Sequence, residues 1–335
     1  MAENNFEYII DISKLEMGDI ILAIFDSRIA TAMNRVTGSP YHHAMIVAGE
    51  ATVLHSGSAG VHSANPLRMV FEKPDDVVAV RHLKKPSYNK LVDATNFVRT
   101  KVGTAYSTEE RDRVKNAGDG ESVEPNRQFC TRLVAQAYRE IGFPLVENAD
   151  YCTPKELLES DKVVILQDIL VKGNRIQLKY AKEKSEALDT QEQATNYILE
   201  QARHITQVDI QSLQQLESFV EKNPEFDANL TAVVVESGYL ELIDIDMKKN
   251  PEHYGFQIMK DKIPKKYWVS VASKQMPIAD RMKRSAAHEV SRLQAKHDSQ
   301  PLDFFKVHID LAKKLVDAFE KMERTMKRAI TQFIK

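Results

Sequence analysis

The sequence predicts an α+β domain followed by a helical domain. The first half of the chain contains short apolar runs separated by glycine-containing turns, as expected of strands. A later segment of that half opens an amphipathic helix with a cysteine. From about residue 185 glycine becomes rare and apolar residues recur at helical spacing. We therefore expect an α+β domain in residues 1–180 and a helical accessory domain in residues 185–335.

Length and composition fit an ordinary two-domain protein. The chain has 335 residues, of which 43% are hydrophobic and 28% charged, and its net charge is −2. Such a balance gives no general attraction to nucleic acid, so no nucleic-acid partner is expected. Cys130 and Cys152 are too few for a disulfide framework. Residues 1–7 lack the apolar stretch of a signal peptide, and we expect a cytoplasmic location, with signal-independent export left open.

Strands are expected in four apolar stretches of the first half, at residues 18–25, 41–47, 52–55 and 77–83. Residues 163–178 have two short apolar runs on either side of Gly173-Asn174. Glycine next to asparagine is typical of a tight turn between strands. The sequence therefore predicts a hairpin in that region.

Helical spacing in the same half occurs at residues 88–102 and at residues 130–141, and Gly142 ends the second of these. Thr153, followed by proline and then glutamate, begins a short capped helix. Residues 107–127 are polar and contain glycine and proline, which predicts a loop at the entrance to a site.

The second half contains three long segments with a helical pattern. We expect one helix over residues 188–220, favour helix over strand for residues 230–245, and expect a strongly amphipathic helix over residues 302–334. Basic residues flank the apolar stripe of the last segment. Two arrangements are expected as alternatives. The stripe could pack against residues 188–220 in a bundle, or the helix could lie on an anionic membrane or on a protein partner. The bundle is the preferred alternative.

Cys130 and His43 are the candidate nucleophile and base. The first turn of a helix and a nearby imidazole are the two commonest devices that activate a thiol, and Cys130 begins its helix. His55 follows His43 at an even offset. A three-residue or bulged loop at residues 48–50 would place the two histidines directly opposite each other on one face of a hairpin. We therefore predict Cys130 as nucleophile, His43 as base and His55 as the residue that orients His43.

Each of these residues also has a plain structural alternative. A lone buried cysteine is most often an inert apolar side chain, and this applies to Cys130 taken alone. The neighbouring His42 leaves the identity of the base open, because only one of two adjacent strand residues faces inward; His43 is preferred since it shares a face with Met45. Cys152 is expected to be structural. The histidines show no zinc-finger or HExxH spacing, so neither a metal nor a cofactor is expected.

These residues resemble a known family. The resemblance is carried by residues 18–21, 41–47, 53–55, 60–61, 103–106, 129–134 and 152–158. In this order they are similar to the circularly permuted papain-like enzymes of the NlpC superfamily, and the nearest branch is that of the YiiX/YaeF-like amidases. The resemblance covers roughly residues 15–165 and does not extend to the helical half.

The resemblance implies a permuted papain-like fold, in which a small antiparallel barrel-like sheet packs on the helix that carries the nucleophile. The positions that match the family's cysteine, base and third polar residue are Cys130, His43 and His55. Tyr106 and His42 are candidates for substrate binding. The third position in the YiiX-like branch is often acidic, whereas His55 makes the set similar to the lecithin:retinol acyltransferase-like branch, whose members act on lipid acyl groups.

The leading functional hypothesis is a cysteine amidase or peptidase that cleaves an amide or peptide bond through an acyl-enzyme on Cys130. The alternative is a lipid-directed acyltransferase or thioesterase, suggested by His55. A second alternative is a non-catalytic interaction scaffold. The expected substrate is accordingly a peptide, an amide or a lipid acyl compound.

Overall fold

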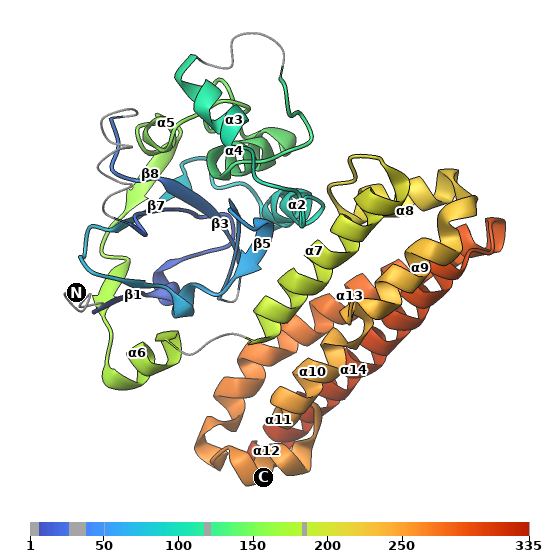
Figure 1. The fold of residues 1–335 in the computed structure, drawn as a ribbon. Helices are drawn as coiled ribbons and strands as arrows, with labels where there is room; N and C mark the ends of the chain where they lie inside the picture. Colours follow the sequence, from blue (N-terminus) through green and yellow to red (C-terminus); the bar gives the residue numbers. More distant parts are fainter. Residues whose placement is uncertain (1–6, 27–37, 50, 117–121, 183–185, 335) are drawn as a thin grey trace, which may run out of the picture. The chain divides into compact units, whose positions relative to one another are not determined.

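Figure 1 shows a strand-rich part and a helical part of the chain. The computed structural model describes residues 7–26, 38–49, 51–116, 122–182 and 186–334. The chain divides into two compact units. Unit 1 consists of Met1–Leu188 with Gln211–Leu213, and unit 2 of Asp189–Ile210 with Gln214–Lys335. All strands of the described residues lie in unit 1.

A six-stranded antiparallel sheet forms the centre of unit 1. Its strands are, in spatial order, β5 (Gly60–Ala64), β4 (Thr52–Gly57), β3 (His43–Gly49), β2 (Ile20–Ala23), β7 (Val77–His82) and β8 (Val163–Leu166). Strands β2, β3, β4 and β7 confirm the four predicted from the apolar stretches. The end strands β5 and β8 do not pair with each other in the described residues. Where a barrel-like sheet was expected, the described part is an open sheet.

A second antiparallel sheet has the strand order β6 (Val70–Phe71), β1 (Tyr8–Ile10) and β9 (Leu170–Lys172). Strand β8 pairs with β7, whereas β9 pairs with β1, so the hairpin predicted for residues 163–178 is wrong. The Oδ1 atom of Asn174 instead accepts hydrogen bonds from the backbone of Ile176 and Gln177, both at 3.0 Å. The Gly-Asn pair therefore precedes a helix, α6 (Arg175–Lys182).

The two faces of the central sheet pack on different partners, because side chains alternate along each strand. Ala44 of β3 joins an apolar cluster with Leu133 of α4 (Cys130–Glu140) and Ala94 of α2 (Tyr88–Arg99). Met45, the next residue of β3, packs instead in a cluster with Phe71 of the second sheet. Helices α2 and α4 thus cover one face of the central sheet, and the second sheet covers the other.

The helices of unit 1 begin largely where the sequence predicts. Helix α4 starts at Cys130 and ends before Gly142, and α5 (Pro154–Leu158) opens with a capping box between Thr153 and Glu156. Two short 3₁₀ helices, η1 (Ile12–Lys14) and η2 (Pro66–Arg68), were not predicted.

The loop expected over residues 107–127 is wrong in its first part. This segment contains the helix α3 (Thr108–Asp112) and the 3₁₀ helix η3 (Arg113–Asn116). Ser107 caps α3, since its hydroxyl accepts a hydrogen bond from the Glu110 backbone at 2.9 Å. Residues 117–121 lie outside the described residues.

In the described residues, unit 2 contains only helices. They are α7 (Glu186–Thr206), α8 (Leu213–Lys222), α9 (Asp227–Glu236), α10 (Leu242–Lys249), α11 (Pro251–Tyr254), α12 (Phe256–Lys262), α13 (Trp268–Ser299) and α14 (Asp303–Ile334), with the 3₁₀ helices η4 (Pro224–Phe226), η5 (Tyr239–Glu241) and η6 (Lys265–Tyr267). The helical preference for residues 230–245 is confirmed, although Gly238, with φ of 76°, separates α9 from α10. The single helix expected over residues 188–220 is wrong, because α7 ends at Thr206 and α8 begins at Leu213.

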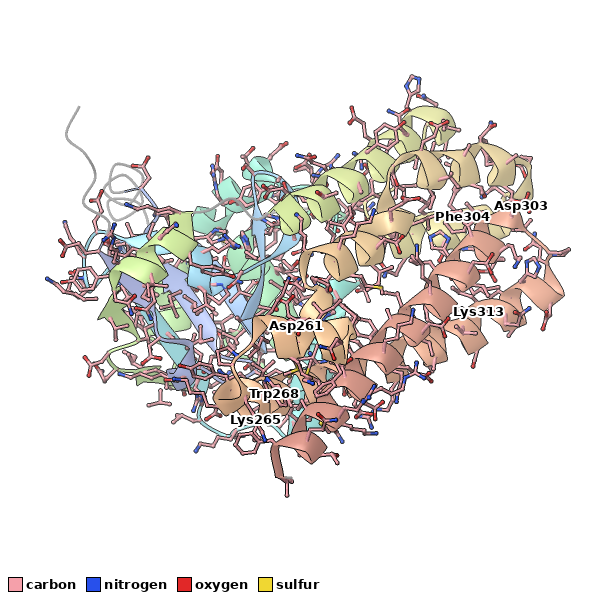
Figure 2. The ribbon with its side chains drawn as sticks, turned by 90° about the horizontal axis from the view of Figure 1, so that it is seen from below. Asp261, Lys265, Trp268, Asp303, Phe304 and Lys313 are labelled. Carbon is pink, nitrogen blue, oxygen red and sulfur yellow. The ribbon has the colours of Figure 1, made fainter. Side chains whose placement is uncertain are left out.

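The helices α13 and α14 lie side by side as a hairpin (Figure 1). Figure 2 shows Lys265 and Trp268 at one end of this hairpin and Asp303 and Phe304 at the other. The apolar stripe predicted for the last helix is present, and it packs chiefly on α13 rather than on residues 188–220. None of the helices in the described residues combines the length and the apolar character needed to cross a bilayer.

Candidate active site

His43 and His55 are in direct contact on neighbouring strands. The Nε2 atom of His43 lies 2.7 Å from Nδ1 of His55, and the rings meet edge to face. The residue directly opposite His55 is Met45, so the predicted direct pairing of the two histidines is wrong by two residues. A bulge between Val47 and Gly49 sets this register. Because two residues is one full period of a strand, the histidines still share a face and meet diagonally.

His62 extends this pair to three imidazoles. It lies opposite His55 on β5, and the centroids of their rings are 4.2 Å apart. His62 Nδ1 lies 3.0 Å from the carbonyl oxygen of Gly60. No role was predicted for His62 from the sequence, because its contact with His55 arises only from the pairing of β4 with β5.

Cys130 is the first residue of α4 and is almost completely buried, with 5% of its surface exposed. Its Sγ atom lies 3.9 Å from the carbonyl oxygen of His42, and the backbone of Ala44 also contributes a hydrogen bond to it. Burial raises the pKa of the Cys130 thiol, and backbone hydrogen bonds from Ala44, Thr131 and Cys130 itself offset only part of this effect. In this resting geometry the thiol is protonated at neutral pH.

The sulfur therefore lies against the backbone on both sides of His43. In the described part of the chain it makes no hydrogen bond to an imidazole ring. The ring of His43 contacts the ring of Phe25 edge to face, at 5.6 Å between centroids. The structure thus brings His43 and His55 together and places Cys130 beside the backbone of His43. Catalytic hydrogen bonds are often long or poorly aligned in unliganded enzymes.

His42 lies at the start of the same strand. Its Nε2 atom accepts a hydrogen bond from the backbone of Phe25 at 3.4 Å, and its Nδ1 atom is buried with no partner among the described residues. Burial lowers the pKa of His42. A role of His42 in substrate binding stays a prediction.

The two paired histidines are held in their neutral forms. Burial lowers the pKa of His43 to about 3, with a further contribution from His42 and His62. Burial, together with His43 and His62, also lowers the pKa of His55 well below its usual value. At neutral pH the site therefore contains neutral imidazoles, and a neutral imidazole is the form that accepts a proton.

Tyr106 lies next to the residues that lead into α4. It forms an isolated parallel bridge with Gln128, and the Ser107 amide donates to the Gln128 carbonyl oxygen at 2.9 Å. Burial raises the pKa of the Tyr106 hydroxyl, and the nearby Cys130 adds to this increase. The positive charge of Arg111 acts in the opposite direction and lowers the pKa of Tyr106. Tyr106 is therefore close to the candidate nucleophile. Its role in substrate binding stays a prediction.

Glu110 connects the segment around α3 to the helix of Cys130. One carboxylate oxygen accepts from the Ser122 hydroxyl and the backbone of Val123 and Glu124 at 2.7–2.9 Å, and the other accepts from Arg132 at 2.7 Å and from Tyr151. Burial alone would raise the pKa of Glu110, but these hydrogen bonds outweigh it and hold the pKa at about 2.

Glu110, Arg111 and Arg132 also belong to this region and were not predicted from the sequence. A serine followed three residues later by a glutamate, here Ser107 and Glu110, is a signal for the start of a helix, and it would have revealed α3. The ion pair with Arg132 has no comparable signal, because its partners are 22 residues apart.

Cys152 lies in the structural position expected for it. It is buried, its Sγ atom donates to the Thr131 carbonyl oxygen at 3.6 Å, and burial strongly raises the pKa of its thiol. Cys130 and Cys152 are both free thiols. Across the residues described, no cluster of three or more His, Cys, Asp or Glu side chains is arranged to hold a metal ion.

Comparisons with known proteins concern the first half of the chain. Residues 14–164 match the family model of the permuted papain-like amidase enzymes of the YaeF/YiiX type, family C92. A crystal structure of the metalloprotein YiiX from Escherichia coli O157:H7 is similar at 14% sequence identity and a TM-score of 0.37, over 48% of this chain and 98% of that one. The comparison with curated proteins found no match. The similarity to the permuted papain-like amidases of the YaeF/YiiX type is thus confined to residues 14–164, less than half of the chain.

Proposed function

We propose that unit 1 is a cysteine hydrolase that cleaves an amide or peptide bond through an acyl-enzyme on Cys130. The observation that carries the proposal is the position of the Cys130 sulfur, which lies against the backbone on both sides of His43 while the ring of His43 is hydrogen-bonded to His55. A nucleophile, a base and a group that orients the base are the minimum set for such catalysis.

His43 acts as the base through its Nδ1 atom, because its Nε2 atom is engaged with His55. Nδ1 takes the thiol proton as the sulfur attacks the carbonyl carbon of the substrate. The carbon–nitrogen bond then breaks, and His43 gives the proton to the leaving nitrogen. Water, deprotonated by His43, next attacks the thioester; the carbon–sulfur bond breaks, the acid is released, and the sulfur regains its proton.

The start of α4 supplies donors for the negative charge that develops in this reaction. Backbone hydrogen bonds from Cys130 and Thr131 reach the sulfur, and each favours its charged form. Amide groups in the first turn of a helix lack partners within the helix and are suited to bind an oxyanion. In the proposed reaction the Cys130 amide donates a hydrogen bond to the oxygen of the attacked carbonyl.

A lipid-directed acyltransferase or thioesterase is the second candidate, and one observation favours it. The residue that orients His43 is a histidine, and the half-buried His55 is neutral rather than a carboxylate. Both candidates share the acyl-enzyme and differ only in the acyl donor and acceptor. Comparing amides with lipid esters of the same acyl group separates them.

The alkylation rate of Cys130 by iodoacetamide, measured from pH 5 to 10 by peptide mapping, tests the proposal. General-base assistance is worth about 10²–10⁴ in rate, so we expect His43→Ala to lower the rate at pH 7 by at least about tenfold. His204→Ala, at an exposed position, and Cys152→Ala serve as controls and leave the rate within about twofold of wild type. Equal rates for wild type and His43→Ala at every pH would instead support the non-catalytic scaffold.

A further inference from the structure

Hydrogen bonds connect α3 and the residues just before it to the chain on both sides of Cys130, to Gln128 and to Arg132. On the side that precedes Cys130, the Ser107 amide donates to the Gln128 carbonyl oxygen at 2.9 Å, and the Gln128 amide donates to the Ala105 carbonyl oxygen at 3.1 Å. On the side that follows Cys130, Glu110 accepts from Arg132 at 2.7 Å. These contacts fix the position of α3, and with it Arg111, relative to the start of α4.

Arg111 is the next residue after Glu110, and it combines proximity to the sulfur with access to solvent. Its positive charge is near enough to lower the pKa of Tyr106 and of the Cys130 thiol, against the larger effect of burial on both groups. Its side chain is nevertheless 39% exposed. A positive charge that is accessible to solvent is thus held near the start of α4.

The guanidinium of Arg111 is occupied by a carboxylate in this structure. Its Nε and Nη2 atoms both donate to Oδ1 of Asp112, at 2.9 and 2.6 Å. Asp112 is 66% exposed, and exposed ion pairs of this kind contribute little free energy, about 0–1 kcal/mol. A carboxylate from a substrate can therefore replace Asp112 at small cost, and the planar guanidinium binds carboxylates with two donors.

We infer that Arg111 binds a carboxylate of the substrate close to the carbonyl that Cys130 attacks. This inference rests on the proposed function and narrows its substrate class to amides and peptides that carry a carboxylate near the scissile bond. Glu110 is the positioning residue that holds Arg111 in place through its contact with Arg132.

Two alkylating reagents that differ only in charge test the inference on the full-length protein. Iodoacetate and iodoacetamide react with a thiolate in the same way, with displacement of iodide, but only iodoacetate carries a carboxylate. We expect Arg111→Gln to lower the ratio of the iodoacetate rate to the iodoacetamide rate at Cys130 by about tenfold at low salt. Arg111→Lys keeps most of the ratio, and added salt reduces the wild-type ratio.

Arg113→Gln is the matched control, because Arg113 lies in the same segment with its guanidinium over the ring of Tyr151, 6.0 Å from the centroid. It leaves the ratio unchanged. A ratio that is the same in wild type and Arg111→Gln overturns the inference while leaving the proposed function intact. A Cys130 that reacts with neither reagent overturns both.

Protection experiments identify the anion. N-acetylglycine is expected to slow the reaction of Cys130 with iodoacetamide, and to do so less in Arg111→Gln, whereas N-acetylglycinamide gives no protection. Stronger protection by inorganic phosphate than by N-acetylglycine at equal concentration overturns the carboxylate assignment in favour of a phosphorylated substrate.

Discussion

The carboxylate of Glu110 and the guanidinium of Arg132 form an ion pair of 2.7 Å from which solvent is almost entirely excluded, with side chains 0% and 4% exposed. Arg132 lies two residues after Cys130, on the buried side of the same helix. The planar group of Arg132 also lies over the rings of Phe129 and Tyr151, at 4.8 Å from each centroid. The pair is therefore part of the packing that fixes the start of α4.

Replacing Glu110 by glutamine is expected to destabilise unit 1 strongly. Glutamine keeps the shape of the side chain but leaves the buried charge of Arg132 uncompensated, which costs about 3–5 kcal/mol. The loss in unfolding free energy is measured by urea unfolding, with hydrogen exchange in β3 and β4 as the probe. The exposed pair of Lys155 and Glu159, 3.9 Å apart, gives the control: Glu159→Gln changes the unfolding free energy by no more than about 0.5 kcal/mol. Similar changes in both variants would contradict the importance of the buried pair.

The stability of unit 1 is expected to fall as the pH decreases from about 6.5 towards 3. His43 has a pKa of about 3 in the folded state and a usual value of 6.5 when unfolded, so the unfolded state binds more protons between these values. His55 shifts in the same direction. Each histidine contributes a slope of up to about 1.4 kcal/mol per pH unit.

The stability of wild type and of His43→Asn, measured by hydrogen exchange of β4 at pH 7, 6, 5 and 4, tests this pH dependence. The variant lacks one titrating group and should show a smaller slope. His204→Asn, at an exposed position in α7, should retain the full slope. Parallel slopes in all three proteins would argue against a neutral His43 in the folded state.

Gly60 and Gly142 form a matched pair for testing backbone conformation. Both have positive φ, at 91° and 78°, where an alanine costs about 1–2 kcal/mol. A Cβ atom at Gly60 would also lie 2.6 Å from the carbonyl oxygen of Thr104, whereas nothing lies within 4 Å of one at Gly142. We expect Gly60→Ala to lower the unfolding free energy by about 2 kcal/mol more than Gly142→Ala. Equal losses would show that the conformation alone determines the cost.

Phe305 tests whether the core of unit 2 is energetically separate from the candidate site. It is completely buried in α14, and Phe305→Ala is expected to cost about 3–5 kcal/mol. The fluorescence of Trp268, the single tryptophan, reports the unfolding of this unit. The alkylation rate of Cys130 in Phe305→Ala should equal that of wild type at temperatures where unit 2 of the variant is folded. Phe333→Ala, at a residue that is 40% exposed, is the control and should cost much less.

The sequence determined the features that depend on local periodicity. Short apolar runs located β2, β3, β4 and β7, helical spacing located α2, α4 and α14, and the Thr153 capping box located α5. The placement of Cys130 at the first residue of a helix also follows from local signals, because Gly142 and the apolar spacing define that helix. These patterns involve residues close in the sequence, so they can be recognised from the sequence alone.

The tertiary structure alone decided the register and the long-range contacts. A bulge between Val47 and Gly49 places His55 opposite Met45, and no local pattern fixes where a bulge occurs. Gly173-Asn174 suggested a hairpin, but pairing of β8 with β7 and of β9 with β1 made it the start of α6. The contact of Glu110 with Arg132 and the position of Arg111 near Cys130 exist only in the folded chain. Periodicity specifies which face a side chain occupies, whereas packing between distant segments selects its neighbours.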